Sequence, residues 1–396
     1  MRSAVAQRSR AARASGDDRL VVERIGETAA FAGMREEWNE LLEASTSNCL
    51  FLTWEWLFTW WHHLSSTRTL SLITVRRAGR LIAILPVAVR PPSAGRLVPW
   101  PTLEFLGTGV AGSDYLDLIV RRGHEREALV AVADAVATER RVTLLTHVPE
   151  HGSHAAGLAG ALEQRRWTMW RRPLNVCPVI PLRGRSWRDY LESLGAAHRY
   201  NFQRRLKNLN KQFEVRFEAC RSERERREAM DVLVDLHNRR WRERGGSASF
   251  ATAERRAFYD DVSRLALERG WLRLFVLRLD GQPAAALHGY RYGDTFSFYQ
   301  AGFEPDFARY SVGLVTMGLT IKSAIDDGAG EYDLLHGDEA YKSLWARQTR
   351  DLVRIELFPP SLRGRLSRLA LSASRTGRRA ARRILGDVIA DRLSRA

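Results

Sequence analysis

The sequence predicts an α/β fold of two related lobes, each a mixed, largely antiparallel sheet covered by helices. The chain has 396 residues, which is long for one hydrophobic core and comfortable for two. Segments of strand character alternate with segments whose apolar residues recur at helical spacing. Both halves share one order, in which three antiparallel strands are followed by a helix, a strand and a helix.

The first half begins with the strand-like segment 20–26. Its later elements follow from apolar spacing and turn residues, with Ala78 and Gly79 at the turn between two paired strands. The expected helices are 31–44, 53–64, 125–139 and 155–164. The expected strands or extended segments are 70–79, 80–90, 103–106, 115–120 and 142–148.

The second half repeats this order after an extended entry at 177–182. The expected helices are 187–212, 222–244, 252–268, 312–327 and 339–347. The expected strands are 213–219, 271–281, 283–293, 295–303, 332–335 and 352–358, with tight Asp-Gly and Gly-Asp turns in the central group. We therefore divide the chain into a disordered basic arm (1–18), a first lobe (19–175), a second lobe (176–359) and a basic amphipathic tail (360–396).

The charge of the chain is strongly basic and unevenly placed. The formal net charge is +16, and segment 361–396 holds ten arginines against Asp387 and Asp391, which is half of that charge. Such a balance indicates anionic partners, either nucleic acid, phosphate-bearing substrates or an anionic membrane surface. Leu362, Leu366 and Leu369 form an apolar edge within this tail, so it either lies on a membrane or stays disordered.

The remaining composition narrows the class of protein. No apolar run reaches the roughly 18 residues that a membrane span needs, and the N-terminus lacks the apolar centre of a signal peptide. Cys49, Cys177 and Cys220 lie far apart without a CxxC pair, which argues against a zinc site or a disulfide framework and for a reducing cytosol. We expect no metal and a cytoplasmic location, with contact to the inner membrane through the tail.

Polar chemistry is concentrated where the short strand 332–335 ends. His336, Asp338, Tyr341 and Lys342 lie within seven residues of a turn and the helix that follows it. Open α/β sheets bind ligands at such strand ends. We expect His336 or Asp338 to act as the base and Tyr341 as the acid. Lys342 is expected to bind an anionic group of the substrate, and Asp333 either binds the acceptor or orients the turn. The alternative is an ordinary capped helix start, with Asp338 as the N-cap and His336 a turn histidine in water.

A second candidate site precedes the helix at 312–327. Arg309, Tyr310, Ser311 and Gly313 lie at the start of that helix, whose free N–H groups can bind an anion. The alternative is that Ser311 is a plain cap and Gly313 a packing glycine. A bulge in the strand near Gln300 to Phe303, allowed by Gly302, would let backbone N–H groups polarise a carbonyl.

Two helices carry further patterns. In 187–212, Phe202 and Leu209 belong to an apolar face, whereas Arg204 and Lys207 belong to a basic face without acids. That basic face either binds an anionic substrate or keeps the protein soluble. Four tryptophans crowd the helix at 53–64, and core packing between the lobes is the favoured interpretation over a sugar or acyl pocket. The tryptophans are Trp54, Trp56, Trp60 and Trp61.

Three passages resemble the GNAT acetyltransferase-like proteins of the CelD type, which are relatives of the FemAB aminoacyltransferases. They are FLTWEWLFTWW (51–61), HRYNFQRRLKNLNKQFEVRFE (198–218) and the segment from FARYSVG to EYDLLHGDEAYKSLWA (307–346). The resemblance covers about residues 20–358 and implies two tandem GNAT-like lobes. It also implies acyl-CoA as co-substrate, with acetyl-CoA as the expected form, although ARYSVG replaces the usual phosphate fingerprint.

The resemblance implies an acyltransferase acting on an amine or hydroxyl of a small-molecule or glycan acceptor, in cell-envelope or polysaccharide metabolism. One alternative is an aminoacyltransferase whose donor is aminoacyl-tRNA. Another is a non-catalytic assembly factor at the membrane periphery. A nucleic-acid regulator is disfavoured, because the sequence shows no helix-turn-helix, zinc or RNP-like pattern.

Overall fold

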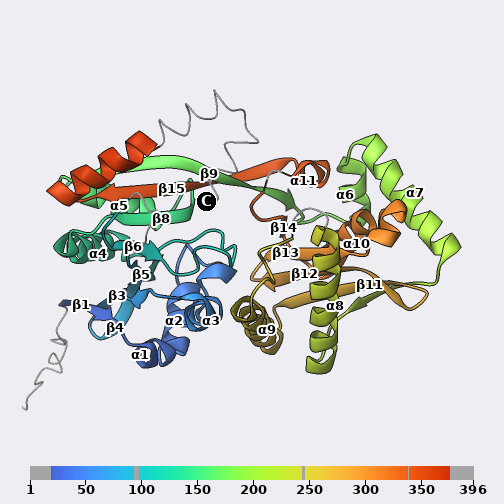
Figure 1. Cartoon of the computed structure of the whole chain (residues 1–396), viewed down its shortest axis with the longest axis horizontal. Helices are drawn as coiled ribbons and strands as arrows, with labels where there is room; N and C mark the ends of the chain where they lie inside the picture. The colour runs from blue at the N-terminus through green and yellow to red at the C-terminus, as the bar shows by residue number, and fades with distance from the viewer. Residues whose placement is uncertain (1–18, 93–97, 243–245, 338, 375–396) are drawn as a thin grey trace, which may run out of the picture.

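The computed structural model of the chain describes residues 19–92, 98–242, 246–337 and 339–374. The expected arm at 1–18, Asp338 and the tail beyond Ser374 lie outside the described residues. Figure 1 shows two lobes side by side, the first in blue to green and the second in light green to orange. Two long strands, β9 and β15, run across both lobes (Figure 1).

The elements of the first lobe cover its sheets with helices. Its strands are β1 (Leu20–Ile25), β2 (Thr69–Leu70), β3 (Leu72–Arg77), β4 (Arg80–Leu85), β5 (Val87–Arg90), β6 (Thr102–Phe105), β7 (Ile119–Val120) and β8 (Thr143–Pro149). Its helices are α1 (Thr28–Ala32), α2 (Arg35–Glu43), η1 (Leu50–Leu52), α3 (Trp54–Leu64), α4 (Glu125–Glu139) and α5 (His154–Glu163).

The second lobe follows β9 (Thr168–Pro181). Its strands are β10 (Val215–Ala219), β11 (Leu272–Leu279), β12 (Gln282–Tyr292), β13 (Thr295–Phe303), β14 (Glu331–Asp333) and finally β15 (Gln348–Phe358). Its helices are α6 (Trp187–Ser193), α7 (Ala196–Gln212), α8 (Glu223–Arg242), α9 (Ala253–Glu268), η2 (Pro305–Tyr310), α10 (Val312–Asp326) and α11 (Ala340–Trp345).

One sheet is continuous through both lobes. Its strand order is β10-β11-β12-β13-β14-β9-β15-β8-β6-β5-β2, and a smaller sheet has the order β1-β3-β4-β7. Within the described strands, only the β13–β14 and β6–β8 pairs are parallel. The expected mixed, largely antiparallel sheets covered by helices are therefore present.

The segment between the lobes is a strand and not a flexible linker. The sequence placed the lobe boundary at residues 165–185, and β9 occupies most of that range. The first part of β9 pairs with β15 beside the first lobe, whereas Val179, Ile180 and Pro181 pair with β14 in the second. β15 in turn pairs with β8, so the last strand of the chain joins the sheet of the first lobe.

Two predicted helices are each divided in two. The expected helix at 31–44 is broken at Gly33 and Met34, where α1 ends and α2 begins. The expected basic helix at 187–212 is broken at Leu194 and Gly195, whose backbones are not helical. Glycine is unfavourable inside a helix because its backbone loses the most conformational freedom there. The glycines at both breaks therefore explain why each helix is interrupted, which the apolar spacing alone does not show.

The lobes pack through α3 and α9. The four tryptophans of α3 are all buried, and Trp56 contacts Phe258, Tyr290 and Tyr299 of the second lobe edge to face. His63 of α3 also bonds Asp261 of α9 over 2.7 Å. The tryptophan helix is thus core packing between the lobes, as expected from its sequence.

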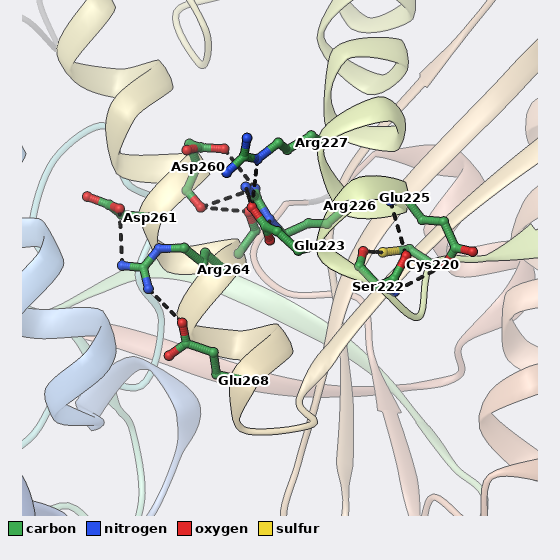
Figure 2. Close-up of polar contacts among 11 residues, drawn as sticks. Cys220, Ser222, Glu223, Glu225, Arg226, Arg227, Asp260, Asp261, Arg264 and Glu268 are labelled. Carbon is green, nitrogen blue, oxygen red and sulfur yellow. Dashed lines mark hydrogen bonds and ion pairs between the residues drawn. The ribbon is translucent and has the colours of Figure 1, made fainter.

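A buried arginine fixes α8 against α9. Arg226 is fully buried, and its guanidinium donates to both oxygens of Glu223 and to Asp260 at 2.7 Å (Figure 2). It also donates to Ser263 at 2.8 Å. These contacts satisfy the charge that burial would otherwise penalise. Because α8 also borders the cleft described below, this network holds one wall of that cleft.

Within the part of the chain that the structure describes, no helix has the length and apolar character needed to span a bilayer. The same residues contain no cluster of three or more histidine, cysteine, aspartate or glutamate side chains arranged to hold a metal ion.

Candidate active site

The candidate site opens where two parallel strands of the second lobe separate. β13 pairs with β14 only from Thr295 to Ser297, opposite Glu331 to Asp333. β14 then ends in a turn, while β13 continues to Phe303. The gap that results is the strand-end position where open sheets bind ligands.

A β-bulge at Tyr299 turns the backbone of β13 at this gap. Phe298 pairs with Gly289 and Gln300 pairs with His288, so Tyr299 is the additional residue. The bulge therefore lies one residue before the expected range of Gln300 to Phe303. Gly302 has a different role, because a Cβ there would lie 2.8 Å from the carbonyl carbon of Leu236, where α8 crosses the strand.

Two adjoining cavities fill the gap. The first, of about 250 Å³, lies between β12, β13 and α10 and has a largely apolar lining. Its walls include Leu287, Phe303, Gly313, Met317 and Trp345. The second, of about 260 Å³, lies between the lobes and is more polar. Its walls include Gly112, His237, Tyr259, Gln300 and His336.

Tyr341 stands where the two cavities meet. Its side chain borders both, together with Arg240, Phe298 and Ala301. Burial raises the pKa of Tyr341 to about 12, so its phenol stays protonated at neutral pH. A protonated phenol at this junction can donate its proton to a group in either cavity.

His336 is oriented by an aspartate of the first lobe. Its Nδ1 lies 2.9 Å from both carboxylate oxygens of Asp114, and its backbone N–H donates to the same carboxylate over 2.9 Å. Asp114 is fully buried, whereas the His336 side chain is 38 % exposed. The hydrogen bond that His336 donates to Asp114 raises the pKa of His336. With Nδ1 donating, neutral His336 presents Nε2 as an acceptor toward the cavity.

Tyr115, which follows Asp114 in the chain, helps to hold the turn that carries His336. Tyr115 donates its hydroxyl to Asp333 over 2.6 Å, and the backbone N–H of Leu335 donates to the other oxygen of Asp333 over 2.7 Å. Burial raises the pKa of Asp333 to about 7. Both oxygens of Asp333 are thus engaged within the protein, so Asp333 positions the turn that carries His336.

Lys342 stabilises the same turn through hydrogen bonds to its backbone. Its ammonium donates to the carbonyl oxygen of His336 over 2.8 Å and to that of Leu335 over 3.3 Å, and it lies 3.0 Å from Glu339. The side chain is only 4 % exposed. These contacts are those of a residue that holds the turn, although Lys342 also borders the polar cavity.

The expected donor-binding residues lie at the start of α10. Gly313 borders the apolar cavity, and its position leaves room, since a Cβ there would meet Phe303 only at 3.5 Å. Tyr310 packs on Phe213, and Ser311 adopts a left-handed backbone (φ 60°) without a side-chain cap. Arg309 is exposed, with its guanidinium 4.8 Å from the ring centre of Tyr310.

The basic face of α7 lies next to this helix start. Arg205 of α7 donates to the carbonyl oxygen of Arg309 over 3.1 Å. Arg204 and Lys207 are exposed on α7 and border neither cavity. The expected apolar face of α7 is buried, with Phe202 and Leu209 in the core.

The structure brings His336, Tyr341, Asp333 and Lys342 together, and it places Gly313 on the adjoining cavity. Asp338, the other expected base, lies outside the described residues. Sequence reasoning missed Asp114 and His237. His237 donates from Nδ1 to the carbonyl oxygen of Ala301 at 3.1 Å and accepts at Nε2 from Ser247 at 2.8 Å. Burial lowers the pKa of His237, so it is neutral.

The comparisons with known proteins concern the domain family and the fold. Residues 196–343, from α7 into α11, match the model of the acetyltransferase (GNAT) domain family. No curated protein sequence matches the chain significantly. The match lies within the second lobe, and it agrees with the resemblance to GNAT proteins that the sequence shows.

Solved structures show the same fold over both lobes. The structure called FemX is 12 % identical, with a TM-score of 0.59 over 84 % of this chain and 96 % of that one. The C-terminal domain of a putative lysylphosphatidylglycerol synthetase from Agrobacterium fabrum is 10 % identical, with a TM-score of 0.51 over 82 % and 92 %. L-PGS from Bacillus licheniformis is 9 % identical, with a TM-score of 0.50 over 86 % and 95 %.

These likenesses concern the fold. Together with the domain match, they confirm the expected fold class, two tandem GNAT-like lobes. The relationship to the CelD type in particular stays a prediction.

Proposed function

We propose that this protein transfers an acyl group from acyl-CoA, with acetyl-CoA as the expected form, to an amine or hydroxyl of a cell-envelope or polysaccharide-related acceptor in the cytoplasm. The observation that carries the proposal is the path from the α10 start, through the apolar cavity and past Tyr341, to His336 Nε2, which makes no hydrogen bond to another described residue. The cavity for the donor, the acid Tyr341 and the base His336 would thus lie next to one another.

The apolar cavity suits the thioester arm of the donor. Its lining by Leu287, Met317 and Trp345 would remove the arm and its acyl group from water. The α10 start at its mouth offers free N–H groups to phosphate, and Arg309 and Arg205 add positive charge next to it. The residues present therefore fit an anionic donor with an apolar arm.

The polar cavity would hold the acceptor. His336 Nε2 takes the proton from the acceptor amine or hydroxyl as it attacks the acyl carbon, and Asp114 stabilises the imidazolium that forms. Backbone N–H groups at the Tyr299 bulge polarise the acyl carbonyl. Tyr341 donates its proton to the departing thiolate, so the C–S bond breaks as the new C–N or C–O bond forms.

The class of acceptor follows from the lining of this cavity. It combines aromatic rings with amide, imidazole and guanidinium groups, from Tyr259, Gln300, His237 and Arg240. Such a mixture suits a polar acceptor with a ring, for which a sugar or a sugar-bearing envelope precursor is the natural form.

The basic face of α7 favours a second candidate function. Arg204, Lys207, Asn208 and Lys211 are exposed on a helix whose Arg205 contacts the α10 start. A tRNA backbone would follow such a surface, and the donor would then be aminoacyl-tRNA. Filter binding at two salt concentrations separates the candidates, because Arg204→Gln with Lys207→Gln should abolish tRNA retention only if tRNA is the donor.

The test of the proposal is a thermal-shift screen with a panel of acyl-CoAs, followed by a thiol-release assay on any acyl-CoA that raises Tm. We expect His336→Asn and Tyr341→Phe each to lower turnover by about 100-fold, since general acid–base catalysis contributes factors of this order. The donor should raise Tm in both variants, because neither residue is needed to hold it.

Exposed residues of the same types provide controls. His62→Asn on α3 and Tyr200→Phe on α7 should leave turnover unchanged. If no acyl-CoA and no tRNA changes Tm, the catalytic proposal is overturned in favour of a non-catalytic assembly factor. If His336→Asn and Tyr341→Phe retain full turnover in folded protein, the assigned roles are wrong.

A further inference from the structure

The helix that follows β15 has one face docked on the first lobe. Residues 362–374 are helical and lie along the β9–β15 edge (Figure 1). Leu371 packs with Val98, Trp170 and Phe358, and Ser367 accepts a hydrogen bond from the Trp100 indole over 2.9 Å. These contacts fix the helix on the body of the protein.

The opposite face of this helix is an exposed leucine ridge, formed by Leu362, Leu366 and Leu369. Their side chains are 72 %, 45 % and 61 % exposed. At about 100° per residue, spacings of four and three put them on one line, roughly opposite Leu371. Single exposed leucines are ordinary, but three on one ridge of a docked helix form a patch that a soluble surface seldom keeps.

The segment that carries the leucine ridge has charges of one sign. Arg363 and Arg365 are exposed on either side of the ridge, and no acidic residue occurs from Pro359 to Gly386. Seven further arginines follow in the sequence between residues 375 and 396. A surface that pairs an apolar ridge with flanking arginines complements a layer with an apolar interior and an anionic boundary.

We propose that the leucine ridge inserts into the interface of an anionic lipid bilayer, so that the first lobe lies on the membrane along its β9–β15 edge. The three leucines enter the acyl boundary, while Arg363 and Arg365 remain at the depth of the phosphates. A second copy of the chain is a poorer occupant, since a two-fold pairing of the ridge would bring arginines against arginines. This inference does not depend on the proposed catalytic function.

The experiment is sedimentation of the full chain with vesicles of phosphatidylcholine alone or mixed with phosphatidylglycerol. We expect binding only to the anionic vesicles, and a loss of most of it at 0.5 M salt, because salt screens the arginine–phosphate attraction. The Leu362→Gln, Leu366→Gln, Leu369→Gln triple variant should bind at least about ten-fold more weakly, since it removes the apolar contribution.

A matched triple variant distinguishes the ridge from general surface polarity. Val21→Thr, Val22→Thr and Val130→Gln change exposed apolar residues of β1 and α4 and should leave vesicle binding unchanged. The proposal would be overturned if the triple leucine variant bound anionic vesicles as strongly as the unaltered protein. It would also be overturned by absence of binding to anionic vesicles, or by a full chain that is dimeric in sedimentation equilibrium and becomes monomeric when the ridge is changed.

Discussion

Asp114 lets the first lobe determine the chemistry of a histidine in the second. The carboxylate accepts both the backbone N–H and the Nδ1–H of His336, so it selects the tautomer with a free Nε2. Because Asp114 is fully buried, this attraction is little weakened by water. Asp114 is therefore a positioning residue, and the first lobe is part of the candidate active site.

At the scale of the residue, we predict that Asp114→Asn lowers kcat by about 10- to 100-fold, because the partner that orients the imidazole is lost. Asp114 raises the pKa of His336, and a base acts in its unprotonated form. The rising limb of kcat/KM against pH should therefore move to lower pH in the variant. A pH profile in the thiol-release assay measures both effects.

The same change can be followed without substrate. The NMR titration of the His336 imidazole should show a lower pKa in Asp114→Asn. Asp231→Asn on the exposed face of α8 removes the same charge away from the site and should leave the titration unchanged. If Asp114→Asn shifts neither the rising limb of the pH profile of kcat/KM nor the NMR titration of His336, Asp114 does not orient His336.

How far the sequence predicts the site depends on the separation of its residues along the chain. His336, Tyr341 and Lys342 lie in one strand–turn–helix segment, so their proximity follows from local structure. Asp114 lies 222 positions before His336, and no local pattern indicates that contact. The role of Lys342 could not be predicted either, because the sequence does not show whether the ammonium of a lysine near a strand end contacts substrate or backbone carbonyl oxygens.

At the scale of the element, the close crossing of α8 over β13 depends on Gly302. A Cβ at this position would lie within 2.9 Å of the Cα of His237 and 2.8 Å from the carbonyl carbon of Leu236, and both are backbone atoms. The crossing places His237 and Arg240 on the wall of the polar cavity. One glycine thus sets the distance between that wall and the strand.

We predict that Gly302→Ala lowers the free energy of unfolding by about 1–3 kcal/mol, because the added methyl overpacks the crossing. Urea unfolding followed by tryptophan fluorescence measures the change. Gly160→Ala in α5 is the control, since its Cβ would meet nothing within 4 Å, and alanine there should stabilise the helix. An unchanged midpoint for Gly302→Ala would show that α8 moves away at little cost.

Elements with regular apolar spacing were predicted closely, whereas β9 was not. The predicted helix at 125–139 coincides with α4, but the predicted extended segment began only at residue 177, whereas β9 begins at Thr168. The missed part carries Arg171, Arg172 and Pro173 and has no clean alternation. Pro173 pairs with Val353 while Asn175 pairs with Leu352, so a bulge accommodates the proline. Long-range pairing with β15, and not local propensity, makes this segment a strand.

At the scale of the whole molecule, the shared sheet and the Trp56 contacts join the lobes into one cooperative unit. We predict a single calorimetric transition, with equal calorimetric and van't Hoff enthalpies. Ile355→Ala in β15 should destabilise both lobes together by about 2–5 kcal/mol, because Ile355 is fully buried and its strand pairs with β8 and β9.

Hydrogen exchange resolves the two lobes in this experiment. Protection in α4 and in α10 should fall in parallel in Ile355→Ala, whereas Leu369→Ala, an exposed change, should alter neither. Two resolved calorimetric peaks, or loss of protection in one lobe alone, would contradict the cooperative unit.

The position of β15 also bears on how the chain is made. During synthesis the first lobe leaves the ribosome long before residue 358 does. The place between β8 and β9 of that lobe stays empty until β15 has been made, because β15 lies between these two strands in the sheet. The nascent first lobe therefore carries an open slot in its sheet throughout synthesis of the second. Such a slot invites pairing with foreign strands, so early binding by a chaperone would protect the newborn chain until its last strand closes the gap.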